Sequence, residues 1–264
     1  MRLWTSLLPQ SHPIEETTEI AVVIDILRAT SVMNVALAGG AKQIVTTRDV
    51  DQARQIARGM PTRPLLCGER ACVPIEGFDC GNSPSEYPRE RVADRELVIT
   101  TTNGTKAIEA ASLAKEVLLG SFLNLTAVVE RLDRAANVAL ICAGTDGLVT
   151  LEDVLFAGAV ITYCQSRFEN SPTNDPLPPL QLNDESVLAR QTWQSWFGRD
   201  PQPGAFKSPS VDALAARLAE SQGGKNVIRA GYRADLTLCA QIDSLSVVPR
   251  RISQRAGASV FAAS

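Results

Sequence analysis

Short apolar runs alternate with segments of helical periodicity along the first two-thirds of the chain. Strands buried on both faces of a sheet read as continuous runs rich in β-branched residues. On this basis we predict strands at residues 19–27, 42–47, 63–69, 95–101, 115–121 and 137–144. Between them, apolar positions at helical spacing predict helices at residues 28–41, 48–59, 104–114, 123–135 and 150–166.

Some of these helices have recognisable end signals. Asp49 and Asn124 are expected to cap the second and the fourth helix, because short polar side chains accept hydrogen bonds from the first free amides. Thr150 and Asp153 form a capping signature at the start of the last helix. The alternation predicts an α/β fold with a mostly parallel sheet and helices on both faces, in three α/β/α layers.

The last third of the chain has a different pattern. Within residues 167–209 the segment SPTNDPLPPL at 171–180 is loop-like and proline recurs at 201, 203 and 209, and helices are predicted at 184–198, 210–221 and 233–243. Gly223 and Gly224 are expected to stop the second of these helices, and residues 244–249 to add a strand that closes the sheet. In the first helix, a core-facing side is predicted for Leu188, Trp193, Trp196 and Phe197. We therefore divide the chain at 1–166 and 167–264, as one continuous domain or two α/β subdomains.

Composition excludes several classes of protein. No run of 18 apolar residues exists, so no membrane span is expected. The net charge is −3 without a basic stripe, which argues against a nucleic-acid partner. His12 is the only histidine, which argues against a Ser-His-Asp triad and against a histidine-rich metal centre. Six cysteines without a C-x-x-C pair or a secretory signal indicate free thiols and a cytoplasmic protein.

Polar residues gather at four predicted strand ends, where ligands bind in parallel α/β sheets. The first group is Asp25 and Arg28, which follow a buried strand. A buried carboxylate is costly unless it is paired or binds a metal. Asp25 is therefore either the ion-pair partner of Arg28 or a metal ligand or nucleophile, with Arg28 as an anion clamp.

The second group is the long loop at residues 68–88. Such loops are often functional in compact domains. Glu69, Arg70 and Asp79 supply charges of both signs, and Asn82 and Ser83 follow Gly81 in a segment that resembles an anion-binding nest. The alternative is a solvated loop built from turn residues.

The third group is the sequence TTNGTKA at residues 101–107, at the start of a predicted helix. A helix start offers free amides and partial positive charge. These features make an anion cradle, although simple helix capping explains the same pattern equally well. The residues of this cradle are Thr102, Asn103, Gly104, Thr105 and Lys106. The fourth group follows residue 144 and includes Asp146, Glu152 and Asp153.

The four groups together combine carboxylates with anion-binding residues. Hard oxygen ligands suit Mg²⁺, which bridges protein carboxylates and phosphate oxygens. We therefore predict a Mg²⁺-dependent phosphoryl-transfer site. The expected metal ligands are Asp25, Glu69, Asp79 and Asp153.

The motifs VIDILRAT, GER…IEGFDCGNSP, TTNGTKA and ICAGTDG…LEDVLFAG occur in this order over about residues 20–160. Together they resemble the 2-phosphosulfolactate phosphatase (ComB) family. The resemblance implies a Mg²⁺-dependent acid phosphatase that converts 2-phospho-3-sulfolactate to 3-sulfolactate and phosphate, a step toward coenzyme M. The D-x-D nucleophile motif of haloacid dehalogenase phosphatases is absent, since Leu27 occupies its second position.

The roles that follow are hypotheses. Asp25, Arg28 and Lys106 are the expected catalytic residues, and either Asp25 or a water molecule held by the metal attacks phosphorus. Substrate binding is assigned to Arg70, Asn82, Ser83, Thr102, Asn103, Gly104 and Thr105. The substrate is a small, phosphorylated and doubly anionic acid, and a homo-oligomer is compatible with the sequence. The alternatives are a non-catalytic binder of a phosphorylated ligand, a phosphatase for another hydroxy acid, and a metal-dependent lyase or isomerase.

Overall fold

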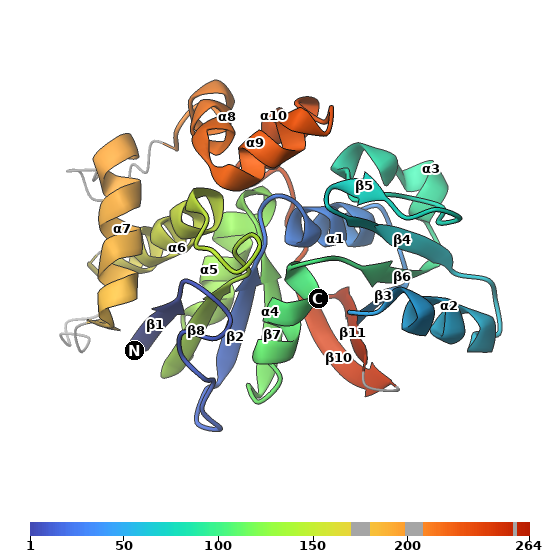
Figure 1. Ribbon diagram of the computed structural model, residues 1–264. Helices are drawn as coiled ribbons and strands as arrows, with labels where there is room; N and C mark the ends of the chain where they lie inside the picture. Colours follow the sequence, from blue (N-terminus) through green and yellow to red (C-terminus); the bar gives the residue numbers. More distant parts are fainter. Residues whose placement is uncertain (170–179, 199–207, 256–257) are drawn as a thin grey trace.

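The structure, a computed structural model, describes residues 1–169, 180–198, 208–255 and 258–264. Eleven strands within these ranges form one sheet in the order β5-β4-β6-β3-β11-β10-β7-β2-β8-β1-β9 (Figure 1). The strands are β1 Arg2–Ser6, β2 Ile20–Ile24, β3 Gln43–Thr47, β4 Leu65–Arg70, β5 Val73–Pro74, β6 Glu96–Thr100, β7 Glu116–Gly120, β8 Asn137–Cys142, β9 Gln181–Leu182, β10 Pro249–Arg255 and β11 Ala258–Ala263.

Helices connect and cover these strands, which confirms the predicted α/β fold with a mostly parallel sheet. In the described part of the chain the α-helices are α1 Ala29–Ala38, α2 Val50–Gly59, α3 Arg89–Val92, α4 Gly104–Ala110, α5 Leu125–Leu132, α6 Leu151–Glu169, α7 Asp184–Phe197, α8 Val211–Glu220, α9 Gln222–Arg229 and α10 Ala234–Cys239. Short 3₁₀ turns lie at Pro84–Glu86 and Phe122–Asn124. None of these described helices is long and apolar enough to cross a bilayer.

The sheet consists of two parallel groups with an antiparallel hairpin between them. Strands β4, β6 and β3 are mutually parallel, as are β7, β2, β8, β1 and β9. The hairpin β10–β11 pairs antiparallel with β7 on one side and with β3 on the other. Three antiparallel pairings in succession leave β3 and β7 running in opposite senses.

Twist of the long sheet brings the two parallel groups together at their carboxyl ends. Strands accumulate a right-handed twist from neighbour to neighbour. In Figure 1, β2 and β8 run nearly upright, whereas β4 and β6 lie nearly across the view. The ends of β2 and β6, which belong to different groups, consequently meet around one cavity, whose residues are described below.

The alternation of side chains along β2 divides the interior into two large cores. Val22 and Ile24 belong to a core that includes α5, α6 and Trp193 of α7. Ala21 and Val23 belong to a second core that includes residues of α1 and α4. A smaller core lies under α2, against β3 and β6. All five residues of β2 are buried, which explains why this strand reads as a continuous apolar run.

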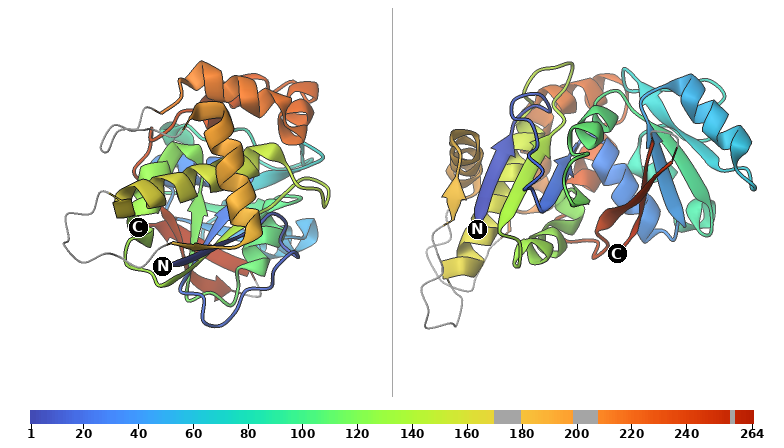
Figure 2. Two further views of the ribbon diagram at one scale, coloured as in Figure 1. Left: turned by 90° about the vertical axis from the view of Figure 1, so that its left-hand side faces the viewer. Right: turned by 90° about the horizontal axis from the view of Figure 1, so that it is seen from below.

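The C-terminal helices α8, α9 and α10 lie over the carboxyl ends of β2 and β8, both in Figure 1 and in the left-hand view of Figure 2. They therefore form a roof over the end of the sheet where ligands bind in this class of fold. The division of the chain at residue 166 stays a prediction, but the hairpin from the C-terminal part is central in the sheet.

Several local expectations were wrong. Gly223 and Gly224 lie inside α9, while α8 ends at Glu220, and the next residue, Ser221, caps α9 by accepting from the Gly224 amide. The expected strand at 244–249 begins only at Pro249. Leu188 is 55% exposed and does not face the core, whereas Trp193 is buried.

Two of the three predicted helix caps also differ. The Asp49 side chain accepts from the amides of Asp51 and Gln52, which confirms that cap. Asn124 occupies the N-cap position of α5, but its side chain makes no capping hydrogen bond there and its Oδ1 accepts from the Ser121 amide at 2.9 Å. The carboxylate of Asp153 accepts from amides outside its own helix, so it makes no capping box with Thr150.

Candidate functional site

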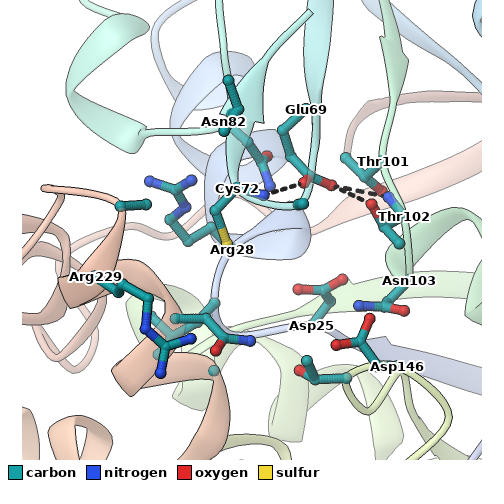
Figure 3. A pocket seen from close by; sticks show the side chains of 17 residues that line it. Asp25, Arg28, Glu69, Cys72, Asn82, Thr101, Thr102, Asn103, Asp146 and Arg229 are labelled. Carbon is teal, nitrogen blue, oxygen red and sulfur yellow. Dashed lines mark hydrogen bonds between the residues drawn. The ribbon is translucent and has the colours of Figure 1, made fainter.

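A cavity of about 410 Å³ lies where β2, β4 and β6 end and where α9 crosses above them. This volume lies within the range of small-molecule sites. Figure 3 shows carboxylates on one side of the cavity and two arginines on the other. The cavity is lined by Asp25, Leu27, Arg28, Glu69, Ala71, Cys72, Val73, Asn82, Thr101, Thr102, Asn103, Thr145, Asp146, Gly223, Asn226, Arg229 and Ala230.

Asp25 lies at the centre of the acidic side. Its Oδ1 accepts a hydrogen bond from the Ala29 amide at 3.0 Å, which orients the carboxylate at the start of α1. Its Oδ2 lies against Gly104, where an added Cβ would be 2.8 Å from that oxygen and 2.6 Å from the Ala29 Cβ. Gly104 is therefore needed for the close approach of α4 to Asp25, a role different from the expected anion cradle.

Burial and neighbouring carboxylates disfavour the charge on Asp25. Burial first, and then the charge of Asp153, raise the pKa of Asp25 to about 8, with Glu69 adding to the effect. The Ala29 amide and Arg28 lower the pKa but do not offset burial. A cation beside Asp25 would favour the ionised form, because opposite charge stabilises a carboxylate.

Asp153 is buried behind Asp25 and is not in the cavity lining. Its Oδ1 accepts from the Ile26 amide and its Oδ2 from the Gly144 amide, both at 3.0 Å. Burial and the neighbouring Glu152 raise the pKa of Asp153 to about 8. Asp153 thus joins the segments that follow β2 and β8, and it influences the site through Asp25.

Glu69 holds two loops of the cavity together. Its Oε2 accepts from the Cys72 amide at 2.8 Å, and its Oε1 accepts from the Thr102 amide and hydroxyl at 2.9 and 3.0 Å (Figure 3). Ala71 and Cys72 have positive φ angles of 51° and 63° in the turn that these bonds stabilise. The Thr102 amide is therefore already bound to a carboxylate.

Arg28 is buried on the opposite side and is held from two directions. Its Nη1 lies 2.6 Å from Oδ2 of Asp235, and its Cζ lies 4.4 Å from the ring centroid of Tyr232. The Ser83 hydroxyl donates to the other oxygen of Asp235 at 2.7 Å. The ion pair considered from sequence, between Arg28 and Asp25, is thus replaced by one with a residue of α10.

Helix α9 contributes further donors to the cavity. Asn226 and Arg229 lie three residues apart and both line the cavity. Oδ1 of Asn226 accepts from Nε2 of Gln222 at 2.9 Å, so its amide nitrogen is left as a donor. In the part of the chain that the structure describes, Arg229 has no acidic partner.

The cavity brings together Asp25, Arg28, Glu69, Thr102 and Asn103, with Asn82 in its wall. Besides Gly104 and Asp153, the structure places five other predicted residues outside the lining. Asp79 accepts from the Leu66 amide and pairs with Arg63, and Arg70 donates to backbone oxygens and Thr100. Ser83 supports Asp235, the hydroxyl of Thr105 donates to the Thr101 carbonyl, and Lys106 is exposed on α4 outside the lining.

Sequence reasoning missed the contribution of the C-terminal helices. Asn226, Arg229, Tyr232 and Asp235 were not among the candidates, and Asp146 was noted without a role. The sequence KNVIRAGYRAD at 225–235 carries one signal, because Asn226 and Arg229 fall on one helical face. Nothing in that spacing shows which distant strand ends the face will meet.

The residues of the acidic side fit a hard divalent cation. Figure 3 shows the Asp25 and Asp146 carboxylates and the Asn103 amide near one another. Among the residues that the structure describes, the buried side-chain oxygens of Asn82 and Thr101 have no hydrogen-bond partner. Among the described residues, no group of three or more His, Cys, Asp or Glu side chains is placed to hold a metal. Mg²⁺ commonly takes only one or two carboxylates, with water and substrate phosphate completing its shell.

Comparison with known proteins identifies relatives over nearly the whole chain. The family described as 2-phosphosulpholactate phosphatase matches residues 6–254. A protein of Thermotoga petrophila named "Probable 2-phosphosulfolactate phosphatase" is 45% identical over 243 residues, covering 91% of this chain and 92% of that protein. A protein of Symbiobacterium thermophilum with the same name is 40% identical over 240 residues, covering 90% and 93%. One from Thermosynechococcus vestitus, also so named, is 31% identical over 258 residues, covering 97% and 98%.

Proposed function

The chain belongs to the 2-phosphosulfolactate phosphatase family, and on that premise we propose that it hydrolyses 2-phospho-3-sulfolactate to 3-sulfolactate and phosphate with Mg²⁺ bound. The observation that carries this proposal is the cavity in which Asp25 and Asp146 face Arg28 and Arg229. A phosphorylated acid needs carboxylates for a cation and guanidinium groups for its anionic oxygens.

Asp25 and Asp146 would hold the cation, with the Asn103 amide oxygen and Glu69 beside them. Asp79 and Asp153 are not retained as ligands, because neither lines the cavity. When bound, Mg²⁺ would neutralise charge on the phosphoryl oxygens as the ester bond breaks. These residues suit Mg²⁺ because carboxylate and amide oxygens are the hard oxygen ligands that this ion prefers.

The protein's own residues bind and orient the substrate. Arg28 is rigid and buried, so it can direct N–H donors at an anionic oxygen without losing side-chain freedom. Thr101, whose buried hydroxyl has no partner within the described ranges, supplies a further polar group near Asp25. In the reaction a water oxygen forms a new bond to phosphorus and the ester P–O bond breaks. A proton from the attacking water passes to the leaving ester oxygen, which is released as the hydroxyl group of 3-sulfolactate.

The test is phosphate release from purified protein with 2-phosphosulfolactate, measured with EDTA and again after addition of Mg²⁺. We expect release that EDTA abolishes and Mg²⁺ restores. Tight binding without release would support the non-catalytic alternative, and loss of phosphate with formation of a carbon–carbon double bond would indicate a lyase. A panel of other phosphorylated hydroxy acids tests the substrate. The link to coenzyme M, the cytoplasmic location and a homo-oligomer stay predictions.

A further inference from the structure

Two arginines line the cavity, and they are held very differently. Arg28 is 2% exposed and shares its charge with Asp235, so the pair contributes little net charge. Arg229 is exposed at the end of α9, and no carboxylate in the described ranges pairs with it. Of the cations that the structure places in the lining, Arg229 therefore carries the positive charge that is not already compensated.

Asn226, which lies on the same face of α9 as Arg229, can also donate a hydrogen bond. The hydrogen bond from Gln222 occupies the Asn226 oxygen and leaves its amide nitrogen as a donor, and Asn226 lines the cavity. Gly223, one turn earlier, also lines the cavity and packs directly on Glu152. An added Cβ there would be 1.8 Å from a Glu152 oxygen. This close contact fixes the position of α9, so its two donors are presented from a well-packed helix.

We propose that Asn226 and Arg229 form a second anion subsite, which binds an acid group of the substrate other than the phosphate; this rests on the proposed function. Figure 3 shows Arg229 across the cavity from Glu69 and Asp146, so the subsite is separate from the carboxylates that face the phosphate. A guanidinium binds planar or trigonal oxyanions through paired hydrogen bonds. The ligand is a terminal sulfonate or carboxylate, which have this chemistry in common.

The test compares substrates and variants in pairs. The substrates are 2-phosphosulfolactate, 2-phospholactate, which lacks the sulfonate, and 2-sulfoethyl phosphate, which lacks the carboxylate. The variants are Arg229→Gln and Asn226→Ala, with Lys225→Gln as the control. Lys225 is exposed on the same helix but does not line the cavity, so its change removes the same charge without removing the subsite.

We expect Arg229→Gln to lower kcat/KM for 2-phosphosulfolactate by about tenfold or more, mainly through KM, because a charge-assisted contact made in ground and transition states is lost. Asn226→Ala should give a smaller loss in the same direction. The loss of kcat/KM in both variants should be much smaller with the truncated substrate that lacks the group bound by Asn226 and Arg229. A smaller loss with 2-phospholactate would identify that group as the sulfonate, and a smaller loss with 2-sulfoethyl phosphate would identify it as the carboxylate. Lys225→Gln should match the unsubstituted protein.

Equal losses on all three substrates, or no loss on any, would overturn the subsite. The first result would place Arg229 at the phosphate, and the second would leave it as a solvated surface residue. If the unsubstituted protein releases no phosphate from any substrate, the proposed function fails. Calorimetric binding of 2-phosphosulfolactate and its two truncated forms to the protein and to Arg229→Gln then tests the subsite by itself, with the same pattern expected in Kd.

Discussion

Arg28 and Asp235 form a buried ion pair, with Nη1 and Oδ2 2.6 Å apart, although 207 positions separate them in the sequence. The first residue follows β2 and the second belongs to α10, so the pair fastens the C-terminal helices to the strand end that carries Asp25. Tyr232 and Ser83 complete the surroundings of the pair. The roof of the cavity and Arg28, which we propose as an anion-binding residue, are thus held by the same contact.

Loss of Asp235 should affect both stability and substrate binding. Removing one member of a buried pair leaves an uncompensated charge and costs about 3–5 kcal/mol. We expect Asp235→Ala to lower the free energy of unfolding by an amount of this order, measured by urea denaturation, and to raise KM. The double variant Arg28→Met with Asp235→Leu should recover stability but not activity. A double variant as unstable as Asp235→Ala would contradict this account of the pair.

Asp25→Asn should lower activity without lowering the stability of the protein. The neutral amide keeps the shape of the side chain but cannot act as a carboxylate toward metal or phosphoryl group. A loss of at least about 100-fold in kcat is expected, by the usual effect of removing a positioned catalytic carboxyl. The metal-free variant should be at least as stable as the unsubstituted protein at pH 8, because the unfavourable buried charge is gone. Undiminished hydrolysis would remove Asp25 from the reaction, and Asp79→Asn, outside the cavity, is the control.

The metal-free protein should lose stability as the pH rises from roughly 4 to 8. The pKa values of Asp25 and Asp153 are each about 8 in the folded protein, against an ordinary 3.8. Between these values the folded state holds protons that the unfolded state has released, so the free energy of unfolding falls with pH and levels off above pH 8. Thermal unfolding in EDTA at several pH values measures this. Mg²⁺ should reduce the slope, and stability that increases across this range would contradict the assignment.

Gly104→Ala should displace the Asp25 carboxylate. The new methyl group would lie 2.8 Å from Oδ2 of Asp25 and 2.6 Å from the Cβ of Ala29, so helix α4 or the carboxylate must move. Overpacking of this kind costs about 1–3 kcal/mol, and a misplaced carboxyl lowers kcat. Gly59→Ala is the matched control, because no atom of the described residues lies within 4 Å of its added Cβ. Thermal unfolding and kcat of both variants measure the effect, and equal behaviour of the two would contradict it.

The elements predicted correctly from the sequence are those whose burial is visible in their own pattern of apolar residues. Strands such as β2 are covered on both faces, so every residue is apolar and the run is unmistakable. Strand β1 has a mixed composition, and β10 carries Arg250 and Arg251 together with polar residues, so neither has such a run. The pairing of β11 with β3 and of β10 with β7 joins segments far apart in the chain. The apolar periodicity of one segment does not indicate which distant strand that segment pairs with.

The sequence by itself determined the α/β class, and it placed Asp25, Glu69 and the segment from Thr102 to Gly104 at strand ends, where ligands bind in such sheets. Only the tertiary structure decided what these residues meet. The hairpin β10–β11 reverses one group of strands, the twisted sheet brings the carboxyl ends of both groups to one cavity, and the roof adds Arg229 and Asp235. The physical reason is that periodicity reports the burial of each segment, whereas contacts between distant side chains depend on how the segments pack.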